Sequence, residues 1–335
     1  MKNNPPLVFS ESYNTLSNSE TRLLEKTLKE VDKFILKSRE ISKVSYATRD
    51  AHSLSLGYIS GEFNPSKFIT VKEIFPNENY PVLVRFSHAP LKISQLESKK
   101  IPAYGLALKI DIGENEANFP LVNFPVFVTN SVTTFLRLFS NLNRFYTSSL
   151  LAKPFVALRL LSSGVSILFD SLKGNVFSEA RKWLRTYSHF IGARSYHSIG
   201  VYRLGNQMIK LKLTPKTYDP HFSNSDNEKS AIENYLQKKT LIYDIFYQVA
   251  TDKNKQPINI LTKIWKDAPY DPLGELKLTT FLHERDLEQE KIAFNPFDNP
   301  EELQPVGKIQ HLRKSTYEHS IRKRNELNKN NTPEN

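Results

Sequence analysis

Apolar residues recur at helical spacing near the beginning of the 335-residue chain, between residues 18 and 40. Residues three and four apart share one face of a helix, so this segment is predicted to form an amphipathic helix. Ser and Thr residues at its start are candidates to cap its free backbone N–H groups. The apolar positions are Leu23, Leu24, Leu28, Val31, Phe34 and Ile35.

From about residue 52 to residue 128 the pattern changes to short apolar runs separated by Pro, Asn and Gly. The runs YPVLVRFS, YGLALKIDI and FPLVNFPVFV are typical of strands. Helical spacing returns over residues 131–190, followed by the strand-like runs QMIKLKLTP, LIYDIFYQVA and GELKLTTFL and a last helix that begins near Pro305. Without a repeat or a Gly/Ser linker, this order favours one antiparallel β barrel with inserted helices over two domains.

The composition narrows the classes of function. The chain contains no Cys, which excludes disulfides, zinc–thiolate sites, iron–sulfur clusters and a Cys nucleophile. Any metal must therefore be bound by His, Tyr or carboxylate, and no HExxH pair offers a zinc site. The net charge of +11 favours anionic partners, but the basic residues are scattered and no nucleic-acid motif accompanies them. A nucleic-acid partner is not expected.

The N-terminal residues lack an apolar core of signal-peptide length, so a cytoplasmic location is expected. The most apolar stretch, residues 148–169, contains Lys153 and Arg159. Its uncharged part, Leu160–Phe169, is far shorter than the ~20 residues needed to span a bilayer, so a transmembrane helix is not expected. A surface helix that contacts membrane or lipid stays open beside a core-packed helix, as does a homodimer.

A polar stripe runs along the predicted C-terminal helix. At 100° per residue, Arg313, Tyr317, Ser320 and Arg324 fall within an arc of about 60°. A solvated basic face with one Tyr would explain this stripe on its own. In the functional interpretation, Arg313 donates to the phenolic oxygen of Tyr317 and stabilises the phenolate that binds ferric iron, while Arg324 reaches a haem propionate.

Six segments in order resemble the short members of the catalase-like family, and together they cover nearly the whole chain. RDAHSLSLGYISGEF, Arg49–Phe63, resembles the segment with an Arg three residues before the distal His, and YPVLVRFS is similar to the catalase VRFS strand. YGLALKI, NFPLVNFPVFV, Phe135 and LRKSTYEHSIRKR follow. The resemblance implies an α+β fold in which an eight-stranded antiparallel barrel, with haem b inside it, carries an N-terminal helix, inserted helices and a C-terminal haem-ligand helix.

The expected domain organisation is an extension over residues 1–17, a catalase-like haem-binding domain over residues 18–328 and a disordered, Asn- and Lys-rich tail over residues 329–335. The resemblance does not extend to the C-terminal helical domain of long catalases. NADPH binding and their interlocked tetramer are therefore not expected.

Carried over residue by residue, the resemblance implies a complete haem site. His52 is the distal acid and base, with Ser87 as its hydrogen-bond partner, and Tyr317 is the iron ligand. The implied cofactor-binding residues are Arg49, Ala51, Arg85, Phe127, Phe135, Arg313 and Arg324. His88 and His197 match no motif position and are treated as structural.

The distal amide departs from the catalase pattern. Catalases carry two consecutive Asn residues before Thr-Pro, whereas this chain has the single-Asn sequence Val122-Asn123-Phe124-Pro125. We assign the amide role to Asn123. The alternative is that Asn123 bridges the end of a strand.

These residues favour a haem-dependent enzyme of the catalase or peroxidase type that acts on hydrogen peroxide or on organic or fatty-acid hydroperoxides. Two alternatives are a fatty-acid hydroperoxide isomerase, similar to allene oxide synthases, and a non-catalytic carrier of haem or lipid. Allene oxide synthases of this superfamily carry Thr just before the distal His. Ala51 is apolar, like the Val of catalases, and so favours peroxide reduction.

Overall fold

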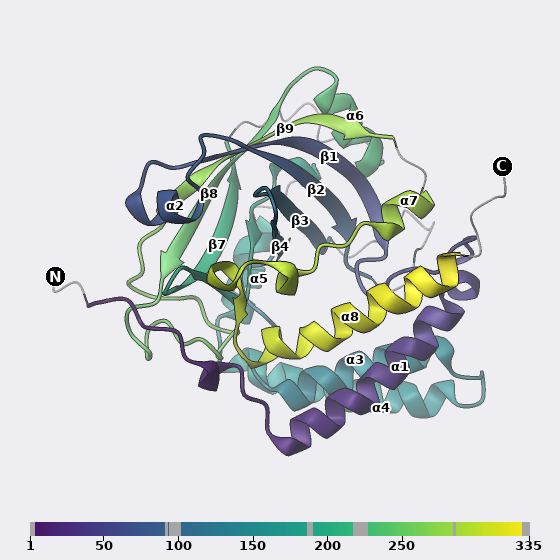
Figure 1. Cartoon of the computed structure of the whole chain (residues 1–335). Coiled ribbons are helices and arrows are strands. Elements are labelled where there is room, and N and C mark those ends of the chain that lie inside the picture. The colour runs from purple at the N-terminus through teal and green to yellow at the C-terminus, as the bar shows by residue number, and fades with distance from the viewer. Residues whose placement is uncertain are drawn as a thin grey trace.

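The structure is a computed structural model and describes residues 4–90, 93, 102–185, 190–216, 227–283 and 286–329. Figure 1 shows a β barrel with a layer of helices packed beside it. Of the expected tail, residues 330–335 lie outside the described part, and Lys329 is the last residue of a helix.

Eight antiparallel strands close into the barrel, because β8 pairs with both β9 and β7. The barrel strands are β1 Leu54–Pro65, β2 Tyr80–His88, β3 Tyr104–Asp111, β4 Glu116–Val122, β5 Tyr196–His197, β7 Gln207–Pro215, β8 Leu241–Val249 and β9 Asp271–Leu282. Two short strands lie beside it, β6 (Val201–Leu204) on β7 and β10 (Pro305–Val306) on β6. The expected eight-stranded antiparallel barrel is confirmed.

Strand alternation fills the barrel with side chains. Along β2, the side chains of Val84 and Phe86 belong to the main buried cluster, whereas Arg85 and Ser87 do not. The same alternation holds along β3, β4, β7 and β8, and successive residues of a strand point to opposite faces of a sheet. The barrel interior is therefore a packed core of aliphatic and aromatic side chains, and the polar residues of interest lie on its outer face.

Helices form in each of the three regions where apolar spacing predicts them. Ser17 caps α1 in a capping box, because its hydroxyl accepts from the N–H of Glu20 at 3.3 Å and the Glu20 carboxylate accepts from the N–H of Ser17 at 2.7 Å. The α-helices are α1 Asn18–Ser42, α2 Ile69–Ile74, α3 Val132–Thr147, α4 Lys153–Leu172, α5 Val176–Arg185, α6 Glu228–Leu236, α7 Asp286–Lys291 and α8 Lys308–Lys329. The short helices α2, α6 and α7 were not predicted from the sequence, because a helix of six to nine residues is too short to show a clear apolar period.

A helical layer built from α1, α3, α4 and α8 covers one side of the barrel (Figure 1). A small apolar cluster joins Leu24 of α1, Leu136 of α3 and Leu312 of α8. At the other end of α8, Asn328 and Ala47 exchange hydrogen bonds of 2.8 Å and 3.1 Å. These contacts fix α8 relative to the segment that precedes β1.

The apolar helix α4 differs from the sequence expectation. Within the described residues it is one helix that, by length and composition, could cross a membrane. The helix is continuous from Lys153 to Leu172, so the prediction from the sequence, which counted only the uncharged part, underestimated the length of the apolar helix. In the structure, 17% of its apolar window is buried.

Candidate functional site

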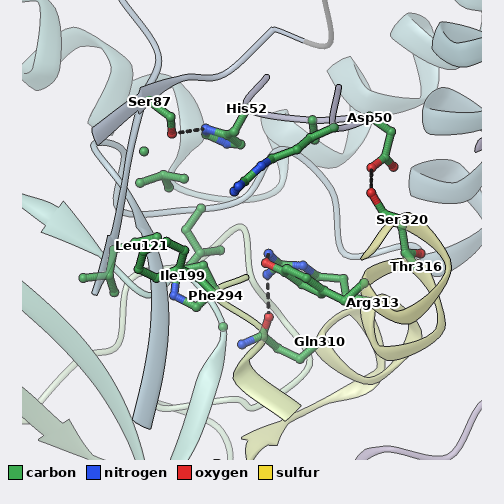
Figure 2. Close-up of a pocket in the computed structure, with 18 of the residues that line it drawn as sticks. Asp50, His52, Ser87, Leu121, Ile199, Phe294, Gln310, Arg313, Thr316 and Ser320 are labelled. Atoms are coloured by element: carbon green, nitrogen blue, oxygen red, sulfur yellow. Dashed lines mark hydrogen bonds between the residues drawn. The ribbon is translucent and has the colours of Figure 1, made fainter. Parts of the chain in front are cut away.

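A cavity of about 330 Å³ lies between the outer face of the barrel and the helices α3 and α8. Strands β2, β3 and β4 supply one wall, and α8 supplies the opposite wall. Figure 2 shows His52 and Ser87 on one side and Gln310 and Arg313 on the other. The expectation of a cofactor inside the barrel is therefore wrong as to place, because the interior is already filled by the main core.

Strand register builds the barrel wall of the cavity. Ser87 of β2 pairs with Gly105 of β3, and Gly105 pairs with Val122 of β4, so these three residues form one row across the sheet. Arg85 pairs with Ala107 two residues further along and faces the same side. All five residues line the cavity. Arg85 and Ser87 thus point outward from β2, whereas the side chains on the other face of this strand belong to the barrel core.

His52 is held at the cavity by an unusual backbone. Its φ of 51° lies in the left-handed region, which residues other than Gly seldom adopt. Its N–H donates to the carbonyl of Ala89 at 3.2 Å, and its carbonyl accepts from Arg85 at 2.8 Å. The ring Nδ1 lies 3.1 Å from the hydroxyl oxygen of Ser87. The expected His52–Ser87 hydrogen bond is therefore present.

Burial, together with the charges of Arg85 and Arg313, lowers the pKa of His52 to about 3. The imidazole is consequently neutral at physiological pH. A neutral imidazole can accept a proton, which is the state that a general base requires.

Gly105 makes room for the His52 ring. A Cβ atom at this position would lie 2.7 Å from Nδ1 of His52 and 2.8 Å from the hydroxyl oxygen of Ser87. These separations are shorter than van der Waals contact, so the ring and the hydroxyl hold their places only because residue 105 has no side chain. Sequence reasoning read Gly105 as part of a strand and missed this role.

We therefore expect Gly105→Ala to displace the imidazole or break its bond to Ser87. The protein should still fold, and any reaction that depends on His52 should slow by about tenfold or more. The matched control is Gly164→Ala, since a Cβ at Gly164 meets no atom within 4 Å. The rate of reaction with peroxide, measured by stopped-flow, compares the two variants. Equal rates would show that the space left by Gly105 beside His52 does not affect the reaction.

The polar stripe of α8 faces the cavity as helical spacing predicts. Arg313, Tyr317, Ser320 and Arg324 all line it. Arg313 donates to the phenolic oxygen of Tyr317 at 2.8 Å and to the side-chain oxygen of Gln310 at 2.9 Å. The expected Arg313–Tyr317 hydrogen bond is therefore present, on the wall opposite His52.

Three arginines gather at one end of the cavity, of which Arg85 and Arg324 are buried and Arg49 is partly buried. Arg49 and Arg324 both form ion pairs with Oε2 of Glu290, at 3.1 Å and 2.9 Å. Arg85 donates to the carbonyl of His52, while its Nε has no partner among the described residues. A buried, unpaired guanidinium N–H is costly, so this corner is suited to an additional anion.

The charges at this corner act on one another. Burial alone would raise the pKa of Glu290, but Arg49, Arg324 and Arg85 hold it below its ordinary value. Burial and the neighbouring charge of Arg49 lower the pKa of Arg324 and of Arg85 to about 10. Both arginines stay protonated at neutral pH, and a carboxylate bound here would relieve their mutual repulsion.

Aromatic side chains supply the apolar part of the cavity. Phe127 and Phe135 line it with their ring centroids 5.3 Å apart, and Phe135 stacks on Phe139 of the same helix. Ala51, next to His52, also lines the cavity. The cavity therefore combines an apolar side with one charged end, as an amphipathic planar ligand would require.

Asn123 is placed differently from the expectation. Its side-chain oxygen accepts from the N–H of Tyr104 at 2.9 Å, and its side-chain nitrogen donates to the carbonyl of Pro102 at 2.9 Å. Asn123 is not among the residues that line the cavity, whereas the preceding Val122 is. In this arrangement the amide bridges a strand end, and its assignment as the distal amide is not supported by the geometry.

The structure brings further polar residues to the cavity that sequence reasoning did not select, among them Asp50, His197 and Gln310. Asp50 accepts from the Ser320 hydroxyl at 2.8 Å, and its second oxygen has no partner among the described residues. His197 lines the cavity although it was treated as structural. Glu290 does not line the cavity itself but pairs with Arg49 and Arg324, and nothing in its local sequence marks it. Of these residues, only Asp50 could have been selected from the sequence, because it lies two residues before His52.

The residues present fit a haem. Tyr317 with Arg313 would hold the iron from one side, and Arg49, Arg85 and Arg324 would bind the propionates. The unpartnered Nε of Arg85 is the observation that most directly points to an absent anion. Phe127 and Phe135 would pack against the macrocycle.

No protein-family model matches the sequence, and no curated protein matches it either. Solved catalases are similar to it in structure. A fungal catalase matches with a TM-score of 0.62 and 16% identity over 97% of this chain and 68% of its own. Catalase A from Saccharomyces cerevisiae matches with a TM-score of 0.61 and 17% identity over 96% of this chain and 68% of its own. A bacterial catalase matches with a TM-score of 0.60 and 16% identity over 98% of this chain and 67% of its own.

Proposed function

We propose that this chain, which has a catalase-like fold corresponding to about two thirds of those catalases, is a haem-dependent enzyme that acts on peroxides. At such low identity the likeness supports the fold alone, so the proposal depends on the cavity. The observation that carries the proposal is that two hydrogen-bonded residue pairs lie on opposite walls of the cavity. His52 with Ser87 lies on one wall, and Tyr317 with Arg313 lies on the other.

His52 is the residue to which we assign proton transfer. As a neutral base it takes the first proton of the peroxide and returns it to the departing oxygen, so that water or an alcohol leaves in place of an anion. The Ser87 hydroxyl at Nδ1 orients the ring and leaves Nε2 to face the substrate. A bound haem would supply the redox-active iron at which the peroxide O–O bond is cleaved.

Tyr317 and the arginines are the residues to which we assign cofactor binding. The Arg313 guanidinium stabilises the negative phenolate oxygen of Tyr317. The positive charge of Arg49, Arg85 and Arg324 exceeds the single negative charge of Glu290. The two propionates of a haem would neutralise the remainder.

An absorption spectrum of the purified protein after incubation with haem tests the cofactor. We expect a ferric Soret band with high-spin tyrosinate character and one haem per chain. A spectrum identical to that of free haem would contradict the proposal. It would then favour a protein that uses this fold without a haem.

The apolar side of the cavity predicts a substrate preference. We expect slow oxygen evolution from hydrogen peroxide and faster turnover of fatty-acid hydroperoxides when a reducing co-substrate supplies two electrons. The measurement is the ratio of kcat/KM for the two peroxides on one preparation, with product analysis. A large excess of the hydrogen peroxide value would contradict the preference, and an epoxide in place of the alcohol would indicate the isomerase.

A further inference from the structure

Helix α4 presents an apolar face to the outside of the molecule. Its large apolar side chains are between 48% and 73% exposed and fall within an arc of about 140° around the helix. Leu150 and Leu151, in the loop before it, are 82% and 87% exposed. The residues of this face are Phe155, Leu158, Leu161, Val165, Leu168, Phe169 and Leu172. Contiguous exposed apolar surface of this kind marks an interaction site.

The other side of α4 is fastened to the body of the protein. Val156 and Ser163 are buried, and α4 packs along α3. Near its end, Thr129 donates to Asp170 and the Ser171 hydroxyl donates to the carbonyl of Val128 at 3.1 Å. Just beyond it, the N–H of Asn175 donates to the carbonyl of Thr262 at 2.7 Å. The helix therefore lies flat on the surface with its apolar face outward.

Basic residues border this face. Residues 148–185 contain six Lys or Arg against two Asp or Glu. Both acidic residues are engaged, Asp170 with Thr129 and Glu179 with Lys182. On α5, Arg181 is exposed on the same side as Phe177 and Leu184. The exposed basic residues are Arg159, Lys173, Arg181, Lys182 and Arg185.

We propose that α4, α5 and the loop before them, residues 150–185, dock on the surface of an anionic phospholipid bilayer. An apolar helix face with a basic border is the pattern of helices that lie in the membrane interface. A second copy of the chain is the poorer partner, because it would bring two basic borders of a protein with net charge +11 together. A spanning orientation would break the bonds that hold the end of α4 to the body.

This surface lies one helix away from the cavity. Phe135 and Phe139 of α3 line the cavity, and α4 packs on the same helix α3. If the proposed peroxide activity holds, docking would place the cavity beside a source of acyl hydroperoxides. The docking itself does not depend on that activity, and its test measures binding alone.

The test is co-sedimentation of the full chain with vesicles of phosphatidylcholine, with or without phosphatidylserine. We expect binding that is about tenfold or more tighter with phosphatidylserine and that weakens as salt is raised. The triple variant Leu151→Ser, Phe155→Ser, Leu158→Ser and the double variant Arg181→Glu, Arg185→Glu should each lose about tenfold or more. Thermal unfolding checks that both remain folded.

The matched control changes exposed apolar residues elsewhere. Phe68 and Ile69, at the start of α2, are 49% and 79% exposed, and Figure 1 shows α2 far from α4. Phe68→Ser with Ile69→Ser should leave vesicle binding unchanged. Failure of the wild-type chain to bind either vesicle overturns the proposal. So does a dimer that the α4 variant dissociates without any vesicle binding, or vesicle association that resists both high salt and alkaline carbonate.

Discussion

Tyr317→Phe is expected to abolish haem binding or to weaken it by several orders of magnitude. The substitution removes the phenolic oxygen, which is the atom of Tyr317 that can ligate iron from the cavity-facing side of α8. The α8 residues that line the cavity include no His. The Nδ1 atom of His319 instead donates to the carbonyl oxygen of Ser315 at 2.9 Å, and His319 does not line the cavity. Titration of the variant with haem, followed by its Soret band, measures the effect.

Two further variants separate ligation from folding. Arg313→Leu should retain the haem but shift its spectrum, because the phenolate loses its charged hydrogen-bond donor. Tyr146→Phe removes a phenolic hydroxyl from α3, where the ring packs edge-on against Phe34, and should bind haem normally. An unchanged spectrum in Tyr317→Phe would show that Tyr317 is not the ligand.

The sequence predicts the fold well wherever periodicity is long enough to read. The 3.6-residue spacing of α1 and α8 and the alternation of β7 and β8 arise from burial of one face, so the pattern and the structure have the same cause. Placement of the cavity could not be read in this way. Alternation tells that Arg85 and Val84 point to opposite faces, but it does not tell which face becomes the barrel interior.

The candidate site was predictable only in part, for a related reason. His52, Ser87 and Tyr317 stand in recognisable motifs, and their hydrogen bonds with local or cross-strand partners follow from register and helical spacing. Glu290 reaches Arg49 from 241 residues away, and no local pattern carries such a contact. Asn123 illustrates the converse difficulty, since a motif position alone does not tell whether an amide faces the cavity or bridges a strand end.

The neutral state of His52 gives its proposed role a pH signature. Because burial lowers the pKa of His52 to about 3, the imidazole stays unprotonated from alkaline pH down to about pH 4. The rate of reaction with peroxide should therefore be flat across neutral pH and fall only towards pH 3. The same shift means that the folded state binds fewer protons than the unfolded state below pH ~6.5, so this residue lowers stability as the pH falls from there.

His52→Ala is expected to retain the haem and to lose rapid reaction with peroxide by ~10²- to 10⁴-fold, the usual contribution of a general acid and base. Its ring faces the cavity from the wall opposite Tyr317, so its removal leaves the proximal contacts of α8 intact. Single-mixing stopped-flow with excess peroxide measures the rate, and the Soret band confirms equal loading. Ser87→Ala should be milder, because it removes only the bond that orients Nδ1. His283→Ala is the matched control, since that side chain is 67% exposed. If His52→Ala and His283→Ala react at the same rate, His52 takes no part in the reaction, and the protein is better explained as a carrier that uses the same cavity.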